Sequence, residues 1–118
     1  RDVMQTENLP VIDGKTNMAE ALVTMSNGRL GLLIAVKDGH VEGIVTDGDI
    51  RRSMEHHHTN FFYSTVADNM TRNPKCVSPE TKIAEIDDMM HKNKIHCVLV
   101  TDEDNRLIGV VDSFRLKL

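Results

Sequence analysis

The sequence predicts an α+β fold built from two β-α-β-β-α repeats, packed sheet to sheet around a pseudo-twofold axis. First, a set of short motifs recurs in the same order, at a spacing of about 65 residues, within a chain of 118 residues. Second, the hydrophobic pattern of each copy changes from a short strand to a helix and then to a hairpin. A lone unit of that size buries too little surface to be stable, so the two units are expected to share a core.

Three pairs of motifs define the two copies. They are Asp2-Val3-Met4 with Asp68-Asn69-Met70, Thr16-Asn17-Met18-Ala19-Glu20 with Thr81-Lys82-Ile83-Ala84-Glu85, and Gly43-Ile44-Val45 with Gly109-Val110-Val111. Their order is kept and only small loop changes separate the copies, which makes chance a poor explanation. We therefore expect repeat 1 at residues 1–55, a linker at 56–64 and repeat 2 at 65–118, with the final helix of repeat 2 truncated.

In repeat 1, each element follows from a local pattern. Residues 9–12 form a short apolar strand. A helix follows, with an apolar stripe made of Met18, Ala21, Leu22 and Met25. Residues 31–45 form a hairpin, because Asp38-Gly39 is a favourable tight-turn pair between two apolar runs. A second helix starts near Thr46 and runs to about Met54.

Repeat 2 has the same elements in matching positions. Its strand lies at 75–77 and its hairpin at 97–111. Its helical stripe consists of Ile83, Ile86, Met89 and Met90. Each copy alone would have a three-stranded sheet with one uncovered face, which favours stacking of the two copies. The linker ends in three aromatic residues that we expect to pin it onto the core, Phe61, Phe62 and Tyr63.

Composition excludes several partners. Aromatic residues make up 3% of the chain and Trp is absent, which argues against a base-stacking platform. The net charge of -4 argues against a nucleic-acid partner. No apolar run approaches the roughly 20 residues of a membrane span, so no membrane partner is expected. Cys76 and Cys97 lie in apolar runs, which favours reduced thiols in the cytoplasm, with a disulfide as the alternative.

Neither a metal site nor a catalytic site is expected. The two cysteines have no CxxC spacing, and consecutive residues such as His56-His57-His58 rarely converge on one ion. No Cys–His or Ser–His–Asp arrangement supports catalysis, so the chain is not expected to be an enzyme.

The segment Thr46-Asp47-Gly48-Asp49 is the most informative, because it follows a strand and opens a helix. The N-terminus of such a helix suits an anion. A threonine hydroxyl there can donate to a phosphate, and an aspartate one turn later can accept from two ribose hydroxyls. The same Thr-x-x-Asp spacing also serves as an ordinary helix cap, and both interpretations stay open.

Together these residues resemble a tandem pair of CBS domains, the module named after cystathionine β-synthase. The resemblance rests on the two Asp-x-Met starts, the element order and the segment 43–49, and it covers nearly the whole chain. More narrowly, residues 28–31 and 41–52 resemble the CBS pair of bacterial D-arabinose 5-phosphate isomerases. Those enzymes carry a sugar-isomerase (SIS) domain and supply Kdo, a sugar of lipopolysaccharide.

The resemblance implies a regulatory module that binds a nucleotide or nucleotide sugar in the cleft between the repeats. The effector would be an adenine nucleotide or a CMP-sugar, and no other cofactor is implied. The residues implied to bind it are Thr46, Asp47, Asp49, Ile12, Gly31, Leu32 and Leu33. Thr46 would hold the phosphate and Asp49 the ribose, while the main chain near Ile12 and residues 31–33 would hold the base.

Repeat 2 departs from this pattern. Asp112 stands where repeat 1 has Thr46, and Arg115 stands where it has Asp49. A carboxylate repels a phosphate, and an arginine cannot accept from ribose hydroxyls. We therefore expect one site of this kind, in repeat 1. The alternative function is a ligand-free dimerisation module, and in either case the resemblance implies a homodimer within a larger homo-oligomeric isomerase.

Overall fold

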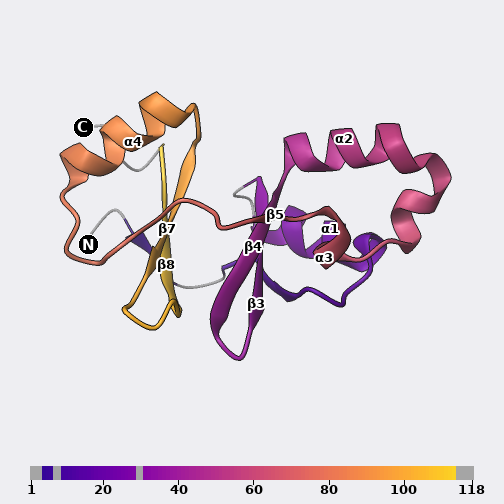
Figure 1. Cartoon of the computed structure of the whole chain (residues 1–118), viewed down its shortest axis with the longest axis horizontal. Helices are drawn as coiled ribbons and strands as arrows, with labels where there is room; N and C mark the ends of the chain where they lie inside the picture. Colours follow the sequence, from indigo (N-terminus) through magenta and orange to yellow (C-terminus); the bar gives the residue numbers. More distant parts are fainter. Residues whose placement is uncertain (1–3, 7–8, 29–30, 114–118) are drawn as a thin grey trace. The chain divides into compact units, whose positions relative to one another are not determined.

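The computed structural model describes residues 4–6, 9–28 and 31–113. The chain forms two compact units (Figure 1). One is the continuous segment Pro10–Pro74, and the other combines residues from 75 onward with residues near the N-terminus.

The Pro10–Pro74 unit holds a four-stranded sheet in the order β2-β3-β4-β5. Strands β2 and β3 are parallel and the other pairs are antiparallel. Its elements are β2 (Val11–Asp13), α1 (Met18–Gly28), β3 (Leu32–Lys37), β4 (His40–Thr46), α2 (Asp47–His57), the 3-10 helix η1 (His58–Tyr63), α3 (Val66–Asn69) and β5 (Thr71–Arg72). The hairpin turns through Asp38 and Gly39, both at positive φ (53° and 83°), as the Asp-Gly pair predicts.

The second unit repeats this plan with fewer helices among its described residues. Its sheet has the order β1-β8-β7-β6, with β6 and β7 parallel. Its elements are β1 (Met4–Gln5), β6 (Cys76–Val77), α4 (Ile83–Asn93), β7 (Cys97–Thr101) and β8 (Leu107–Asp112). The expected final helix of repeat 2, with Arg115, lies outside the described residues. The α+β class with two repeated units is confirmed.

The fourth strand of each sheet was not predicted. Strand β5 follows the Asp-x-Met motif that opens the second repeat, yet it pairs with β4 of the first. Strand β1 contains Met4 of the first such motif, and it pairs with β8 of the second repeat. The compact units therefore differ from the two consecutive halves of the sequence.

Two glycines make this exchange possible. A Cβ on Gly43 would lie 2.7 Å from the Thr71 carbonyl oxygen and 2.8 Å from the Met70 sulfur. A Cβ on Gly109 would lie 2.7 Å from the Gln5 carbonyl oxygen, with the Met4 side chain equally close. The repeated glycine of each hairpin thus contacts the residues in or next to an Asp-x-Met motif. Because the glycine has no side chain, the outer strand, β5 or β1, can pair closely with the hairpin strand.

The cores are mostly aliphatic, and Phe61 is their one aromatic member among the described residues. In the Pro10–Pro74 unit the core consists of Met18, Ala21, Met25, Leu33, Ala35, Val45, Phe61 and Val66. In the other unit it consists of Val77, Ile86, Met90, Val98, Val100 and Val111. The predicted stripe of α1 thus packs in its core, and so does that of α4 except for Ile83, which is 39% exposed. No disulfide joins the cysteines.

The linker differs from the expectation. Helix α2 continues beyond Met54 to His57, and η1 follows directly. Of the three aromatics expected to pin this segment, Phe61 alone is fully buried, whereas Phe62 and Tyr63 are 45% and 84% exposed. A helical segment can point only some of its consecutive side chains toward a core, so a run of three aromatics cannot be buried together.

Candidate functional site

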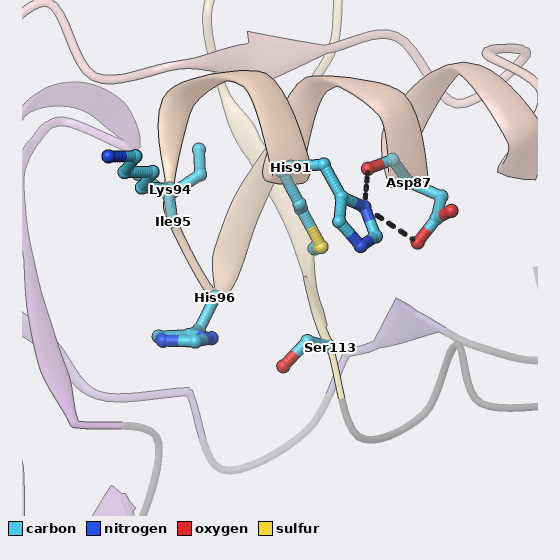
Figure 2. Close-up of a pocket in the computed structure, with 7 residues that line it drawn as sticks. Asp87, His91, Lys94, Ile95, His96 and Ser113 are labelled. Carbon is cyan, nitrogen blue, oxygen red and sulfur yellow. Dashed lines mark hydrogen bonds and ion pairs between the residues drawn. The ribbon is translucent and has the colours of Figure 1, made fainter.

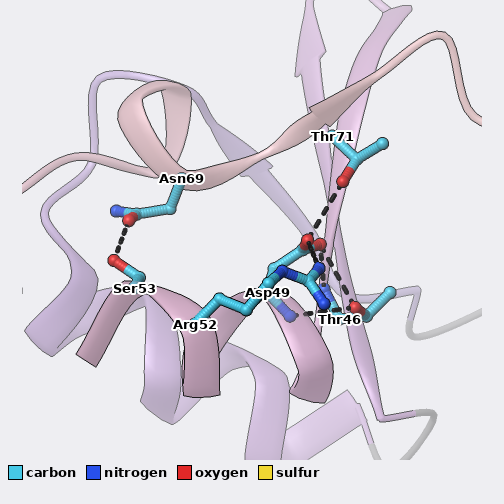
Figure 3. Close-up of polar contacts among 6 residues, drawn as sticks. All are labelled: Thr46, Asp49, Arg52, Ser53, Asn69 and Thr71. Atoms are coloured by element: carbon cyan, nitrogen blue, oxygen red, sulfur yellow. Dashed lines mark hydrogen bonds and ion pairs between the residues drawn. The ribbon is translucent and has the colours of Figure 1, made fainter. Parts of the chain in front are cut away.

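The predicted site lies where β4 ends and α2 begins. Thr46 is the last residue of β4, and Asp47 is the first residue of α2. Asp49, one turn into the helix, is a buried carboxylate with 7% exposure, whereas Asp47 is exposed. The structure therefore brings Thr46 and Asp49 together (Figure 3).

Thr46 and Asp49 cap the helix reciprocally. The Thr46 amide and hydroxyl donate to Oδ2 of Asp49 at 3.0 and 3.1 Å. In return, the Asp49 amide donates to the Thr46 hydroxyl oxygen at 3.3 Å. The capping arrangement that the sequence left open is thus present.

The second carboxylate oxygen is also occupied. Oδ1 of Asp49 accepts from Nη2 of Arg52 at 2.6 Å and from the Thr71 hydroxyl at 3.0 Å. The sequence predicted neither contact, and Thr71 belongs to β5, a strand that was itself not predicted. Figure 3 shows both donors converging on the carboxylate. Asp49 therefore links the end of β4, the first turns of α2, and β5.

A neighbouring contact holds the short helix α3 against α2. The hydroxyl of Ser53, buried on α2, donates to the Asn69 side-chain oxygen (Figure 3). The Asn69 amide donates in turn to Ser64 Oγ at 2.9 Å and to the Thr65 carbonyl at 2.8 Å. Because β5 follows α3 directly, this network fixes the strand that carries Thr71.

The other predicted residues are divided between the site and the core. Gly31 has φ of +71° and is exposed, and a Cβ there would lie 3.6 Å from Oδ2 of Asp47, so these two residues are neighbours. Leu33 is fully buried in the core, and Ile12 packs against the same cluster, so both side chains face the helices. Leu32, 5% exposed, precedes Leu33 on β3 and so points to the opposite face of the sheet.

The matching end of β8 has different chemistry. Asp112 is half-buried beside the Cys97 thiol. Burial, and then the charge of Asp112, raise the pKa of Cys97 to about 11. Burial also raises the pKa of Cys76, against a smaller opposite effect of a hydrogen bond with Thr101.

A cavity of about 550 Å³ lies at the C-terminal end of α4 (Figure 2). It is lined by Asp87, Met90, His91, Lys94, Ile95, His96 and Ser113. The His91 ring is held in place, since Nδ1 donates to the Asp87 carbonyl at 2.9 Å. Basic side chains are favoured at this end of a helix by its dipole, so their presence has a structural explanation.

The described residues contain neither a metal-binding cluster nor a helix that could span a membrane. In the part of the chain that the structure describes, no group of three or more His, Cys, Asp or Glu side chains could hold a metal ion. Among the same residues, no helix is long and apolar enough to cross a membrane.

The family follows from the sequence and the fold. Residues 1–56 and 64–116 match the CBS domain, so the chain belongs to the CBS domain family and carries a tandem pair. It resembles a probable arabinose 5-phosphate isomerase of Haemophilus influenzae (34% identical, 95% of this chain, 33% of the relative). It also resembles the arabinose 5-phosphate isomerase KpsF of Escherichia coli (32%, 96% and 34%). The chain thus spans about a third of the length of these relatives.

Solved structures show the same fold. CBSX2 in complex with AMP matches with a TM-score of 0.83 and 23% identity, over 98% of this chain and 90% of that one. The protein MJ1225 of Methanocaldococcus jannaschii matches with a TM-score of 0.90 and 18% identity, over 98% and 45%. The CBS pair of MJ0100, in complex with 5'-methylthioadenosine and S-adenosylmethionine, matches with a TM-score of 0.83 and 23% identity, over 98% and 89%.

Proposed function

We propose that this CBS pair is the non-catalytic regulatory part of a cytoplasmic arabinose 5-phosphate isomerase. In this proposal it binds a nucleotide, either an adenine nucleotide or a CMP-sugar, at the site of Thr46 and Asp49. Binding changes the activity of an attached sugar-isomerase domain. The similarity to isomerases three times as long supports the attachment. The adenosine-containing ligands in the structures of CBSX2 and MJ0100 support a nucleotide effector.

The observation that carries the proposal is the buried Asp49 carboxylate beside the Thr46 hydroxyl. A carboxylate is acceptor-only, and its two oxygens match the two hydroxyls of a ribose. The adjacent threonine hydroxyl can donate to a phosphate oxygen. Asp112 offers the phosphate only a negative charge at the matching place in the second repeat, so the proposal assigns one such site to each chain.

A thermal-shift screen followed by calorimetry tests the proposal. A ligand at 100 times its dissociation constant should stabilise the protein by about 2.7 kcal/mol. We expect a shift with AMP or with a CMP-sugar, and calorimetry should give one site per chain. Asp49→Asn should abolish binding, and Glu55→Gln, the same chemical change at an exposed position of α2, should not. The absence of a shift with any nucleotide or nucleotide sugar would refute the proposal.

A dimerisation module is the second candidate, and one observation favours it. Four apolar side chains are exposed on elements that contact one another in the Pro10–Pro74 unit. They are Val23 of α1 (61%), Met54 of α2 (39%), and Phe62 (45%) and Tyr63 (84%) of η1. Sedimentation analysis tests this candidate: Tyr63→Ser with Val23→Ser should convert a dimer to a monomer, whereas a wild-type monomer at high concentration would exclude it.

A further inference from the structure

The Asp49 carboxylate already has a full set of donors. Oδ2 accepts from the Thr46 amide and hydroxyl, and Oδ1 accepts from Arg52 and from Thr71. A ligand that presents two vicinal hydroxyls to this carboxylate must therefore displace two donors of the chain, one from each oxygen. Which donors leave decides what else the ligand must offer.

Arg52 is the donor that costs least to displace. On Oδ2, the Thr46 hydroxyl can turn to a phosphate while the two backbone bonds of the cap remain. On Oδ1, the Thr71 hydroxyl is carried on a strand paired with β4. The Arg52 side chain is 66% exposed, on a long flexible stem. Exposed ion pairs contribute little to stability, because water competes for both partners. A diol can therefore replace Arg52 on Oδ1 and the Thr46 hydroxyl on Oδ2 without disturbing the backbone.

In the unliganded chain, the Arg52 guanidinium lies near the Thr46 hydroxyl. A Cβ placed on Gly48 would lie 3.4 Å from Nη1 of Arg52 and 3.7 Å from Oγ1 of Thr46. Both groups thus lie next to the backbone of Gly48, which has no side chain. A phosphate held by the Thr46 hydroxyl would lie within reach of the guanidinium, which pairs with phosphate through two parallel hydrogen bonds.

The charges around the site make Arg52 necessary for an anionic ligand. Asp47 and Asp49 carry two negative charges within the first turn of α2. These charges repel a phosphate, and the Arg52 guanidinium, which lies 2.6 Å from Asp49 in the unliganded chain, brings a positive charge next to them. A neutral nucleoside has no such repulsion to overcome, but it also offers no partner to the released guanidinium.

We propose that Arg52 is the residue that makes this site prefer nucleotides to nucleosides. In the unliganded chain it occupies the Asp49 carboxylate and so competes with any diol. A nucleotide compensates by giving the guanidinium a phosphate, whereas a nucleoside leaves it without a partner. The inference rests on the proposed nucleotide site and adds to it a selection for charge.

Calorimetry with two pairs of probes tests this role, AMP against adenosine and CMP against cytidine. We compare wild type with Arg52→Ala, and Arg51→Ala serves as the matched control because Arg51 is the exposed neighbour on the same helix. In Arg52→Ala the ratio of nucleotide affinity to nucleoside affinity should fall by about tenfold, as expected for loss of a charge-assisted contact. Nucleoside binding itself should be unchanged or tighter. Arg51→Ala should keep the wild-type ratio.

The outcomes separate the two proposals. If nucleotides bind and the ratio is the same in Arg52→Ala and Arg51→Ala, the role of Arg52 is wrong and the site stands. If Arg52→Ala weakens nucleosides as much as nucleotides, Arg52 only supports the fold of the site, and the inference is again wrong. If neither the probe pairs nor a CMP-sugar bind to wild type or to Arg52→Ala, both proposals fail. A third variant, Arg52→Lys, should keep part of the preference for nucleotides, because lysine retains the positive charge but cannot form two parallel hydrogen bonds with a phosphate.

Discussion

Replacing Asp49 by alanine should destabilise the Pro10–Pro74 unit even without a ligand. The substitution removes an acceptor used by four donor groups: the amide and hydroxyl of Thr46 in β4, the guanidinium of Arg52 in α2 and the hydroxyl of Thr71 in β5. The Thr46 amide is part-buried and would lose its partner, while the Arg52 and Thr71 donors can turn to water because both residues are exposed.

The magnitude follows from these contacts. A bond from a part-buried amide to a charged acceptor contributes about 1.5–3 kcal/mol. The exposed Arg52 pair adds at most about 1 kcal/mol. We expect a loss of about 2–3 kcal/mol in the free energy of unfolding, which for a chain of this size lowers the melting temperature by roughly 6–15 °C.

Differential scanning fluorimetry and urea unfolding measure this loss. Glu55→Ala, at an exposed position of the same helix, controls for the general effect of removing a carboxylate. A melting temperature of Asp49→Ala within about 2 °C of wild type and of the control would refute the reasoning. The result also decides how ligand binding can be tested, because a variant that is itself destabilised cannot be judged by its melting temperature alone.

Three further predictions concern the second unit. Gly109→Ala should cost about 1–3 kcal/mol, because its Cβ would meet the Gln5 carbonyl, and urea unfolding with Ser113→Ala as control should show it. Lys82→Ser should stabilise α4 by about 0.5–1 kcal/mol, since Lys82 is an N-cap without a side-chain hydrogen bond; a lower melting temperature would contradict this. Cys97 should react with iodoacetamide at pH 8 more slowly than in urea, because its pKa is about 11, and equal rates by mass spectrometry would exclude this.

The same thiol makes the free energy of unfolding depend on pH. The pKa of Cys97 in the fold lies above its ordinary value of 9.0, so the protonated thiol favours the folded state. This contribution is present below pH 9 and is lost as the pH rises toward 11. In Cys97→Ser, the free energy of unfolding should therefore fall less between pH 9 and pH 11 than it does in wild type.

Local features were predictable because they depend on neighbouring residues. The Asp38-Gly39 turn has the positive φ values that such a pair adopts most easily. The stripe of Met18, Ala21 and Met25 faces the core because helical spacing puts those side chains on one face. The Thr46 and Asp49 cap spans only one helical turn, so its spacing alone indicated the contact.

Contacts between distant residues were not predictable in the same way. Thr71 and Asp49 are 22 residues apart, and nothing in their local sequence pairs them. Strands β1 and β5 have two residues each, too few for a periodicity that would assign them to a sheet. The burial of Phe61 and the exposure of Tyr63 likewise depend on how η1 is rotated against the core.

The amino-acid sequence by itself determined the repeat, the order of elements and the Thr46–Asp49 pair, because each depends on residue types within one or two turns or strands. The tertiary structure decided which sheet receives each Asp-x-Met strand, and it added Arg52 and Thr71 to the Asp49 carboxylate. The physical reason is that a buried carboxylate accepts hydrogen bonds from the donors that lie next to it in the folded chain. Thr71 is one of them because β5 pairs with β4.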